Sequence, residues 1–237
     1  MHKNNEGRFV HALRAKAKSG KNPVIADIKA FSPKEGDLLR GRTAAAVART
    51  LDQAGAPALS VVTEPLHFQG SLAMLEQVAA ATPLPILRKD FIASRADLLD
   101  SKAGGASAVL LICAMHGEKE MQTLFEQAHA LGLEVLVEAH TPAELSLANR
   151  LGAMLKGINN RDILALERDG GGVAQTESLA VHHNQQGLLI SESGLQTRSD
   201  VQRAIRAGAN AVLIGTALLR AVDIAACYRD LESKEEK

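Results

Sequence analysis

The sequence predicts an α/β protein built as a single (β/α)8 barrel, a TIM barrel, with one short extra helix at its N-terminus. Eight short runs rich in Val, Ile and Leu alternate with eight longer, amphipathic, alanine-rich stretches over 237 residues. Each run is almost continuously apolar, which is typical of parallel strands covered by helices on both faces. A barrel of this kind needs roughly 250 residues, so we expect one domain over residues 1–237.

The expected elements follow one another regularly along the chain. Strands are expected at 23–29, 58–62, 85–89, 108–112, 134–139, 154–159, 187–193 and 211–215. Helices are expected at 43–54, 71–80, 95–104, 118–131, 141–151, 173–184, 197–207 and 217–230. Several helical stretches end in Ala-Gly or Leu-Gly, which places a glycine just past the helix C-terminus. The N-terminal extension 1–22 contains a further helix at about 7–19, which covers either the bottom of the barrel or its rim. Residues 232–237 are expected to form a polar tail.

An open, doubly wound sheet is the alternative architecture. Such sheets typically have fewer strands and often begin with a glycine-rich turn. This chain has no such turn after its first strand. The closed barrel is therefore favoured.

Composition excludes several classes of function. The 27 Lys and Arg residues balance 27 Asp and Glu residues, whereas a nucleic-acid-binding domain normally carries a basic excess. No apolar run approaches the roughly 20 residues that cross a bilayer, and the N-terminus lacks the apolar segment of a secretion signal. We therefore expect a cytoplasmic protein that binds neither nucleic acid nor membrane. Cys113 and Cys227 lack metal-ligand spacing, so we expect reduced thiols and no metal site.

Polar side chains occupy the ends of several predicted strands, where the active site of a barrel forms. These residues are Asp27, Lys29, Lys89, Glu138, Asn159 and Glu192. Asp27 and Lys29 are two positions apart, so both point into the barrel mouth. Buried charges are costly unless they are paired or used, and a structural ion-pair network is the alternative interpretation. Charges at four of the eight strand ends favour an acid/base site.

Small residues follow the last two strands. Ser193-Gly194 comes after the seventh strand and Gly215-Thr216 after the eighth. The loops after strands 7 and 8 form the usual phosphate site of this fold, because backbone N–H groups can approach an anion there. Glycines that only make tight turns are the alternative. Because both loops show the pattern, we expect a small phosphorylated molecule as the partner.

Six stretches of the sequence resemble the motifs of a known family. PVIADIKAFSPKEGDLL, PILRKDFI, EVLVEAH, GINNRDI, ISESGL and NAVLIGTALL occur in this order between about residues 22 and 220. They are similar to the successive motifs of indole-3-glycerol-phosphate synthase, the ring-closing, decarboxylating lyase of tryptophan biosynthesis. LIGTALL alone would fit many phosphate-binding barrels, whereas K-D-F-I, then V-E, then G-I-N-N-R-D together indicate this family.

The resemblance implies a substrate and a set of roles. The substrate would be 1-(2-carboxyphenylamino)-1-deoxyribulose 5-phosphate, which is converted to indole-3-glycerol phosphate without a cofactor or metal. Lys89 would be the general acid and Glu138 the general base, and Lys29 would hold the substrate carboxylate. The other implied roles are orientation by Asn159 and Glu192, phosphate binding by Arg161, Ser193, Gly194, Gly215 and Thr216, a substrate contact by Ser32, and an apolar slot formed by Phe68, Phe91 and Leu110. The chain is expected to be a monomer or a weak homo-oligomer.

Two features depart from the family pattern. The first strand normally carries Glu-x-Lys, whereas this chain has Asp27-Ile28-Lys29. Aspartate is shorter by one methylene, which retracts its carboxylate by roughly 1–1.5 Å and predicts slower dehydration if that group is catalytic. The second departure is a short extension of about 22 residues before the first strand, which offers less cover for the substrate.

Two other functions stay open at this point. The first is a related phosphate-binding barrel enzyme similar to phosphoribosylanthranilate isomerase. That reaction is usually run by a Cys/Asp pair with the cysteine at the end of the first strand, where this chain has Asp27 and Lys29. The second is a non-catalytic paralogue that binds a phosphorylated metabolite, and only the change at Asp27 supports it.

Overall fold

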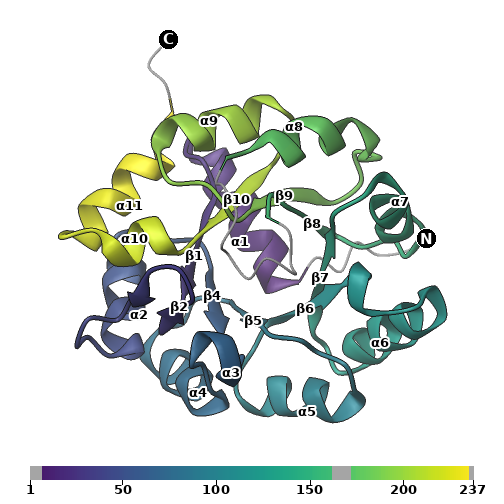
Figure 1. Ribbon diagram of the computed structural model, residues 1–237, viewed down its shortest axis with the longest axis horizontal. Helices are drawn as coiled ribbons and strands as arrows, with labels where there is room; N and C mark the ends of the chain where they lie inside the picture. The colour runs from purple at the N-terminus through teal and green to yellow at the C-terminus, as the bar shows by residue number, and fades with distance from the viewer. Residues whose placement is uncertain (1–6, 162–171, 235–237) are drawn as a thin grey trace.

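Eight parallel strands close into a barrel surrounded by helices (Figure 1). The computed structural model describes residues 7–161 and 172–234. The barrel strands are β1 (Val24–Ile28), β4 (Leu59–Val62), β5 (Ile86–Lys89), β6 (Ala108–Ile112), β7 (Glu134–Ala139), β8 (Leu155–Asn159), β9 (Leu188–Glu192) and β10 (Ala211–Ile214). Closure is complete because β1 pairs with both β4 and β10. The predicted barrel is confirmed, and an open sheet is excluded.

The surrounding helices match the predicted stretches closely. They are α2 (Ala44–Gln53), α4 (Leu72–Ala81), α5 (Arg95–Ala103), α6 (Glu118–Ala130), α7 (Pro142–Arg150), α8 (Ala174–Leu179), α9 (Arg198–Arg206), α10 (Thr216–Arg220) and α11 (Ile224–Glu232). The expected single helix 217–230 is wrong, because the chain leaves the helix at Ala221 and restarts at Asp223. The Asp223 carboxylate accepts a 2.9 Å hydrogen bond from Ala226 N and so caps α11. The expected helix 173–184 is also divided, with η3 (Ala180–His182) after α8.

Short elements in the loops were not expected from the sequence. Strands β2 (Phe31–Ser32) and β3 (Gly36–Asp37) form a small antiparallel hairpin after β1. Helix α3 (Pro65–Phe68) follows β4, and the 3-10 turn η1 (Cys113–Met115) follows β6. The hairpin and α3 lie close together in Figure 1 at the strand ends that form the site.

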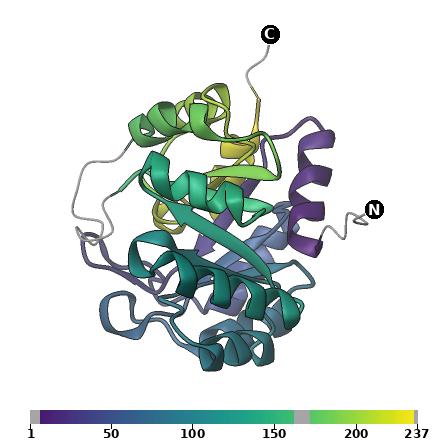
Figure 2. The same cartoon turned by 90° about the vertical axis from the view of Figure 1, so that its right-hand side faces the viewer.

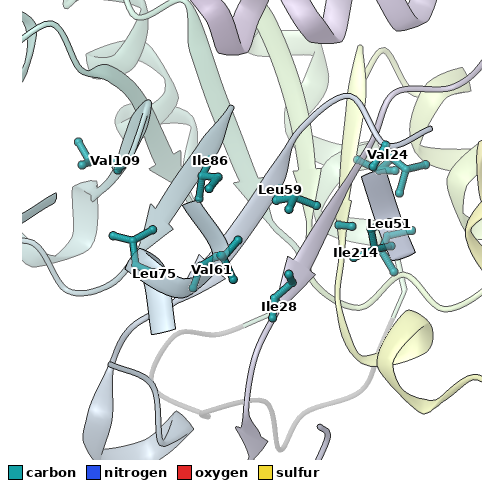
Figure 3. Close-up of a cluster of buried hydrophobic side chains, with 14 of the residues drawn as sticks. Val24, Ile28, Leu51, Leu59, Val61, Leu75, Ile86, Val109 and Ile214 are labelled. Atoms are coloured by element: carbon teal, nitrogen blue, oxygen red, sulfur yellow. The ribbon is translucent and has the colours of Figure 1, made fainter. Parts of the chain in front are cut away.

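Alternate residues of each strand point to opposite sides of the barrel wall, either into the barrel or toward the surrounding helices. Side chains that point outward, such as Ile28, Val61 and Ile86, pack against helix residues such as Leu51 of α2 and Leu75 of α4 (Figure 3). Side chains that point inward form a second cluster inside the barrel, which includes Ile25, Leu87, Leu110, Leu136 and Leu155. Both faces of each strand are therefore apolar, which explains the continuous hydrophobic runs.

Helix α1 (Arg8–Lys18) covers the bottom of the barrel. It projects onto the barrel centre in Figure 1 and lies across one end in Figure 2. Phe9, Val10 and Leu13 are buried and belong to the inner cluster. The carboxylate of Glu134, at the start of β7, accepts hydrogen bonds from Phe9 N (2.7 Å) and Val10 N (3.0 Å). Of the two expected positions, the bottom is therefore the correct one.

The expected polar tail begins later than predicted. Glu232 is the last residue of α11 and is only 6% exposed. It forms an ion pair with Lys16 of α1, which ties the first helix to the last one. The part 235–237 of the tail lies outside the described residues. Among the described helices, none has the length and apolarity needed to cross a membrane.

Candidate active site

One cavity of about 380 Å³ opens at the C-terminal ends of the barrel strands. All of the expected site residues except Glu192 line it, namely Asp27, Lys29, Ser32, Phe68, Lys89, Phe91, Leu110, Glu138, Asn159, Arg161, Ser193, Gly194, Gly215 and Thr216. These residues come from all eight barrel strands or from the loops that follow them. The closed barrel therefore brings residues far apart in the sequence to one mouth.

A lysine and a carboxylate face each other in this cavity. Lys89 Nζ lies 3.9 Å from Glu138 Oε2, and the Lys89 side chain is 20% exposed whereas Glu138 is fully buried. Asn159 Nδ2 donates to Glu138 Oε1 at 3.1 Å, and His140 Nε2 lies 3.5 Å from the same oxygen. Glu138 is therefore oriented by an amide while Lys89 keeps access to the cavity. An ammonium and a carboxylate in this arrangement can give and take protons on one bound molecule.

Glu192 does not line the cavity but lies close enough to Lys89 and Glu138 to interact with their charges, and it is fully buried. Burial raises the pKa of Glu192 well above its usual range, the nearby charges of Glu138 and Asp27 add to the rise, and Lys89 opposes it. Space for this carboxylate exists only because residue 157 is glycine. A Cβ atom on Gly157 would stand 1.8 Å from Glu192 Oε1.

Lys29 lies at the opposite side of the mouth from Glu138. Its Nζ donates to Thr216 Oγ1 at 3.3 Å and stands 5.8 Å from the centre of the Phe68 ring. That distance allows a cation–π attraction. Phe68 is held in turn by Glu64, whose carboxylate accepts hydrogen bonds from the backbone N–H groups at the start of α3, including Phe68 N at 3.1 Å.

The loops after β9 and β10 present small residues and helix N-termini to the cavity. Ser193 and Gly194 both have left-handed backbones, with φ values of 63° and 77°. Thr197 caps α9 and also lines the cavity. Gly215 precedes α10 and packs against Asp27, because a Cβ there would lie 2.9 Å from Asp27 Oδ2. With Arg161 nearby, this side of the cavity suits an anion.

A family model described as indole-3-glycerol phosphate synthase matches residues 1–231 of this chain. The chain belongs to the indole-3-glycerol-phosphate synthase family. The resemblance inferred from the motifs is thus confirmed.

Several members of this family are similar to the chain over most of their length. The indole-3-glycerol phosphate synthase of Pyrococcus furiosus is 46% identical over 208 residues, which cover 88% of this chain and 90% of that protein. The synthase of Thermococcus kodakarensis is 44% identical over 89% of this chain and 92% of its own. The synthase of Listeria welshimeri is 42% identical over 205 residues, which cover 86% of this chain and 80% of that protein.

A solved structure of a different protein shares the fold. The thiamine phosphate pyrophosphorylase from Pyrococcus furiosus superposes with a TM-score of 0.62 over 88% of this chain and 92% of that one. The two sequences are only 12% identical. This likeness supports the barrel alone.

Several lining residues of the synthase-family site were not expected from the sequence. They are Lys34, Glu35, Glu64, Asp90, Thr197 and Arg220. Glu64 carried a signal, since it stands directly before Pro65 and proline is common at the first position of a helix. Glu35 and Arg220 carried none, because they form an ion pair across 185 positions of sequence that joins the β2–β3 hairpin to α10.

The described residues contain no group of three or more His, Cys, Asp or Glu side chains placed to hold a metal ion. Both cysteines are free thiols. Burial raises the pKa of the Cys113 thiol to about 12, with the charges of Glu144 and Glu138 as further causes. A thiol in this state is a poor nucleophile.

Proposed function

We propose that this protein is an indole-3-glycerol-phosphate synthase acting on 1-(2-carboxyphenylamino)-1-deoxyribulose 5-phosphate. The observation that carries the proposal is the Lys89–Glu138 pair, 3.9 Å apart, at the centre of a cavity with an apolar wall and an anion-binding wall. Membership of the synthase family agrees with it.

The order of strands around the barrel supports one orientation of the substrate across the mouth. Phe91 and Leu110 belong to the β5 and β6 side of the barrel, whereas Gly194 and Gly215 follow β9 and β10. In the closed order of strands, β5 stands opposite β9 and β6 stands opposite β10. An aromatic ring on the first side and a phosphate on the second would bring the ribulose carbonyl between them, close to Lys89.

The proposed chemistry uses these groups in sequence. Lys89 donates a proton to the ribulose carbonyl oxygen as the aromatic carbon that bears the carboxylate forms a bond to the carbonyl carbon. Breaking of the bond to the carboxylate releases CO2 and returns an electron pair to the ring. The new hydroxyl then accepts a proton from the ammonium group of Lys29 and leaves as water. Glu138 takes a proton from the methylene carbon next to the ring nitrogen, and the electron pair of that C–H bond forms the double bond that completes the pyrrole ring. Lys29 holds the substrate carboxylate beforehand, and Asn159 and Glu192 orient the reacting groups.

Turnover gives a direct test of this proposal. Addition of the carboxyphenylamino-deoxyribulose phosphate to the purified protein should produce the fluorescence of indole-glycerol phosphate. If high concentrations of the protein give no increase, the synthase proposal is wrong and the non-catalytic alternative gains support.

The Lys89→Ala variant tests the assignment of the acid. We expect a loss of kcat of about a hundredfold or more, because general acid catalysis contributes roughly 10²–10⁴. Substrate should still bind, which can be measured by its displacement with product. The exposed Lys18→Ala variant is the control, and full activity in Lys89→Ala would show that another group donates the proton.

The cellular location and the assembly state are further proposals. We infer a cytoplasmic monomer or weak homo-oligomer. We also infer that it needs no cofactor or metal, because the proposed reaction uses only acid/base side chains of the protein itself. Gel filtration over a range of protein concentrations tests the assembly state, and activity in the presence of a chelator tests the absence of a metal requirement.

A further inference from the structure

Asn160, the residue after β8, joins three segments around the anion-binding side of the cavity. Its Nδ2 group lies 2.9 Å from Ser191 Oγ, 2.9 Å from Glu192 O and 3.1 Å from Ser193 O. Its Oδ1 atom accepts hydrogen bonds from Thr176 N (3.0 Å) and Thr176 Oγ1 (2.9 Å). One amide therefore holds the end of β9 and the first turn of α8 to the end of β8.

These contacts act on the backbone of the loop that presents Ser193 and Gly194 to the cavity. A left-handed conformation costs a non-glycine residue such as Ser193 roughly 1–2 kcal/mol. Two successive carbonyl groups, those of Glu192 and Ser193, are turned toward Asn160, and the backbone N of Asn160 donates to Glu192 O as well, at 2.9 Å. The side chain thus offsets the cost of the turn from outside the cavity.

We propose that Asn160 is a positioning residue that sets the shape of the loop at Ser193-Gly194 and thereby the affinity for the phosphate group. Asn160 does not line the cavity itself, so it acts through the loop. Its two neighbours in sequence, Asn159 and Arg161, do line the cavity, so one short segment supplies both lining side chains and the support of the adjacent loop. This inference rests on the proposed function only where the KM of the substrate is used as the readout.

The chemistry of the position requires an amide. Three oxygen atoms face Nδ2 and two donors of Thr176 face Oδ1, so the side chain must donate on one side and accept on the other. Aspartate has the same shape but no donor when ionised. It would direct a negatively charged oxygen at the carbonyl oxygens of Glu192 and Ser193, which would push the loop away.

The Asn160→Asp variant tests this inference against a matched control. Asn210 holds the same strand at its other end, where its Oδ1 accepts a 2.8 Å hydrogen bond from Leu189 N. We expect Asn160→Asp to raise both the KM of the substrate and the inhibition constant of inorganic phosphate about tenfold, since small misplacements of binding groups are costly. The kcat value should change much less, and Asn210→Ala should alter none of the three.

A second variant covers the case in which Asn160→Asp does not fold. Thr176→Val keeps the shape of the side chain and removes the hydrogen bonds of its hydroxyl to Asn160 Oδ1 and to Ser191 Oγ, which itself contacts Asn160 Nδ2. It should therefore raise the same two constants by about threefold. Unchanged constants in the folded Asn160→Asp variant, or in Thr176→Val if only that variant folds, would overturn the inference.

Calorimetric binding of inorganic phosphate separates this inference from the proposed function. If the unmodified protein binds phosphate without turning over the substrate, the synthase proposal fails. Weaker phosphate binding by Asn160→Asp would then still support its positioning role, whereas equal binding would contradict it. If the unmodified protein neither turns over the substrate nor binds phosphate, both proposals are wrong.

Discussion

Single residues in the site depend on close packing between charged groups and backbone. Glu192 is fully buried next to Glu138 and within reach of the charge on Lys89, which links the three groups electrostatically. Its position is possible only because the facing residue on β8 is Gly157. Gly157 therefore determines where the carboxylate of Glu192 lies.

Gly157→Ala is expected to displace Glu192 and to lower kcat by about a hundredfold, since the added methyl would stand 1.8 Å from Glu192 Oε1. Overpacking should also reduce the free energy of unfolding by about 1–3 kcal/mol. The control is Gly117→Ala, where an added Cβ meets no atom within 4 Å. Steady-state kinetics and thermal unfolding measure both effects, and an unchanged kcat would exclude a role for the position of Glu192.

Asp27→Glu addresses the departure from the family pattern at the end of β1. A longer side chain would carry the carboxylate further into the cavity, so we expect kcat to rise by about threefold to tenfold. Asp27→Asn removes the charge and should lower kcat instead. If the glutamate variant shows the same kcat as the natural chain, the shorter side chain is neutral for the reaction.

Individual helices are secured by side chains at their N-termini. Capping boxes begin α5 at Ser94, α7 at Thr141 and α9 at Thr197, in each case with an acidic residue three positions later. Helix α1 is different, because Gly7 offers no capping side chain and Glu134 of β7 accepts its first N–H groups instead. The helix is thus attached to the barrel by the same contact that caps it.

Glu134→Ala is expected to lower the free energy of unfolding by about 2 kcal/mol, because it removes two charge-assisted hydrogen bonds at the N-terminus of α1. The kcat value should stay the same, since the contact lies at the bottom of the barrel. Glu118→Ala is the matched control: its ion pair with Arg150 is exposed and should contribute less than about 1 kcal/mol. Urea unfolding measures the difference, and equal losses in the two variants would contradict the role of Glu134.

At the scale of the whole molecule, charged side chains are also buried on the outer side of the barrel wall. Lys156 of β8 points outward, is fully buried, and donates to Asn184 Oδ1 (2.8 Å) and Gln186 O (2.6 Å). Burial lowers the pKa of Lys156 to about 8. Burial, together with the charge of Lys156, lowers the pKa of the nearby His183 to about 4.

The folded protein should therefore lose stability as the pH falls from about 6.5 to 4. In this range the unfolded chain binds a proton at His183, whose ordinary pKa is about 6.5, whereas the folded protein does not. His183→Gln removes this effect, so between pH 7 and pH 5 it should lose about 1 kcal/mol less of the free energy of unfolding than the natural chain. Urea unfolding at both pH values is the measurement. Equal pH dependence in the two proteins would mean that folding does not lower the pKa of His183.

The sequence by itself determined the barrel, the order of its strands and helices, and the set of residues at the strand ends. Continuous apolar runs, and polar residues two positions apart at strand ends, are local patterns. They can therefore be recognised in the sequence without knowledge of which segments contact each other. The family motifs added the expected reaction. The break between α10 and α11 was missed because the apolar pattern continues across the cap at Asp223.

Only the tertiary structure decided which groups meet. Closure of the barrel brings Lys89, Glu138 and Glu192 together from three strands, and it decided that α1 covers the bottom of the barrel and leaves the mouth open. The space at Gly157, the ion pair of Glu35 with Arg220, and the hydrogen bonds of Asn160 likewise depend on distances between segments remote in sequence. Periodicity reports which face of an element is buried, whereas the identity of the neighbour on that face is set by how the elements pack.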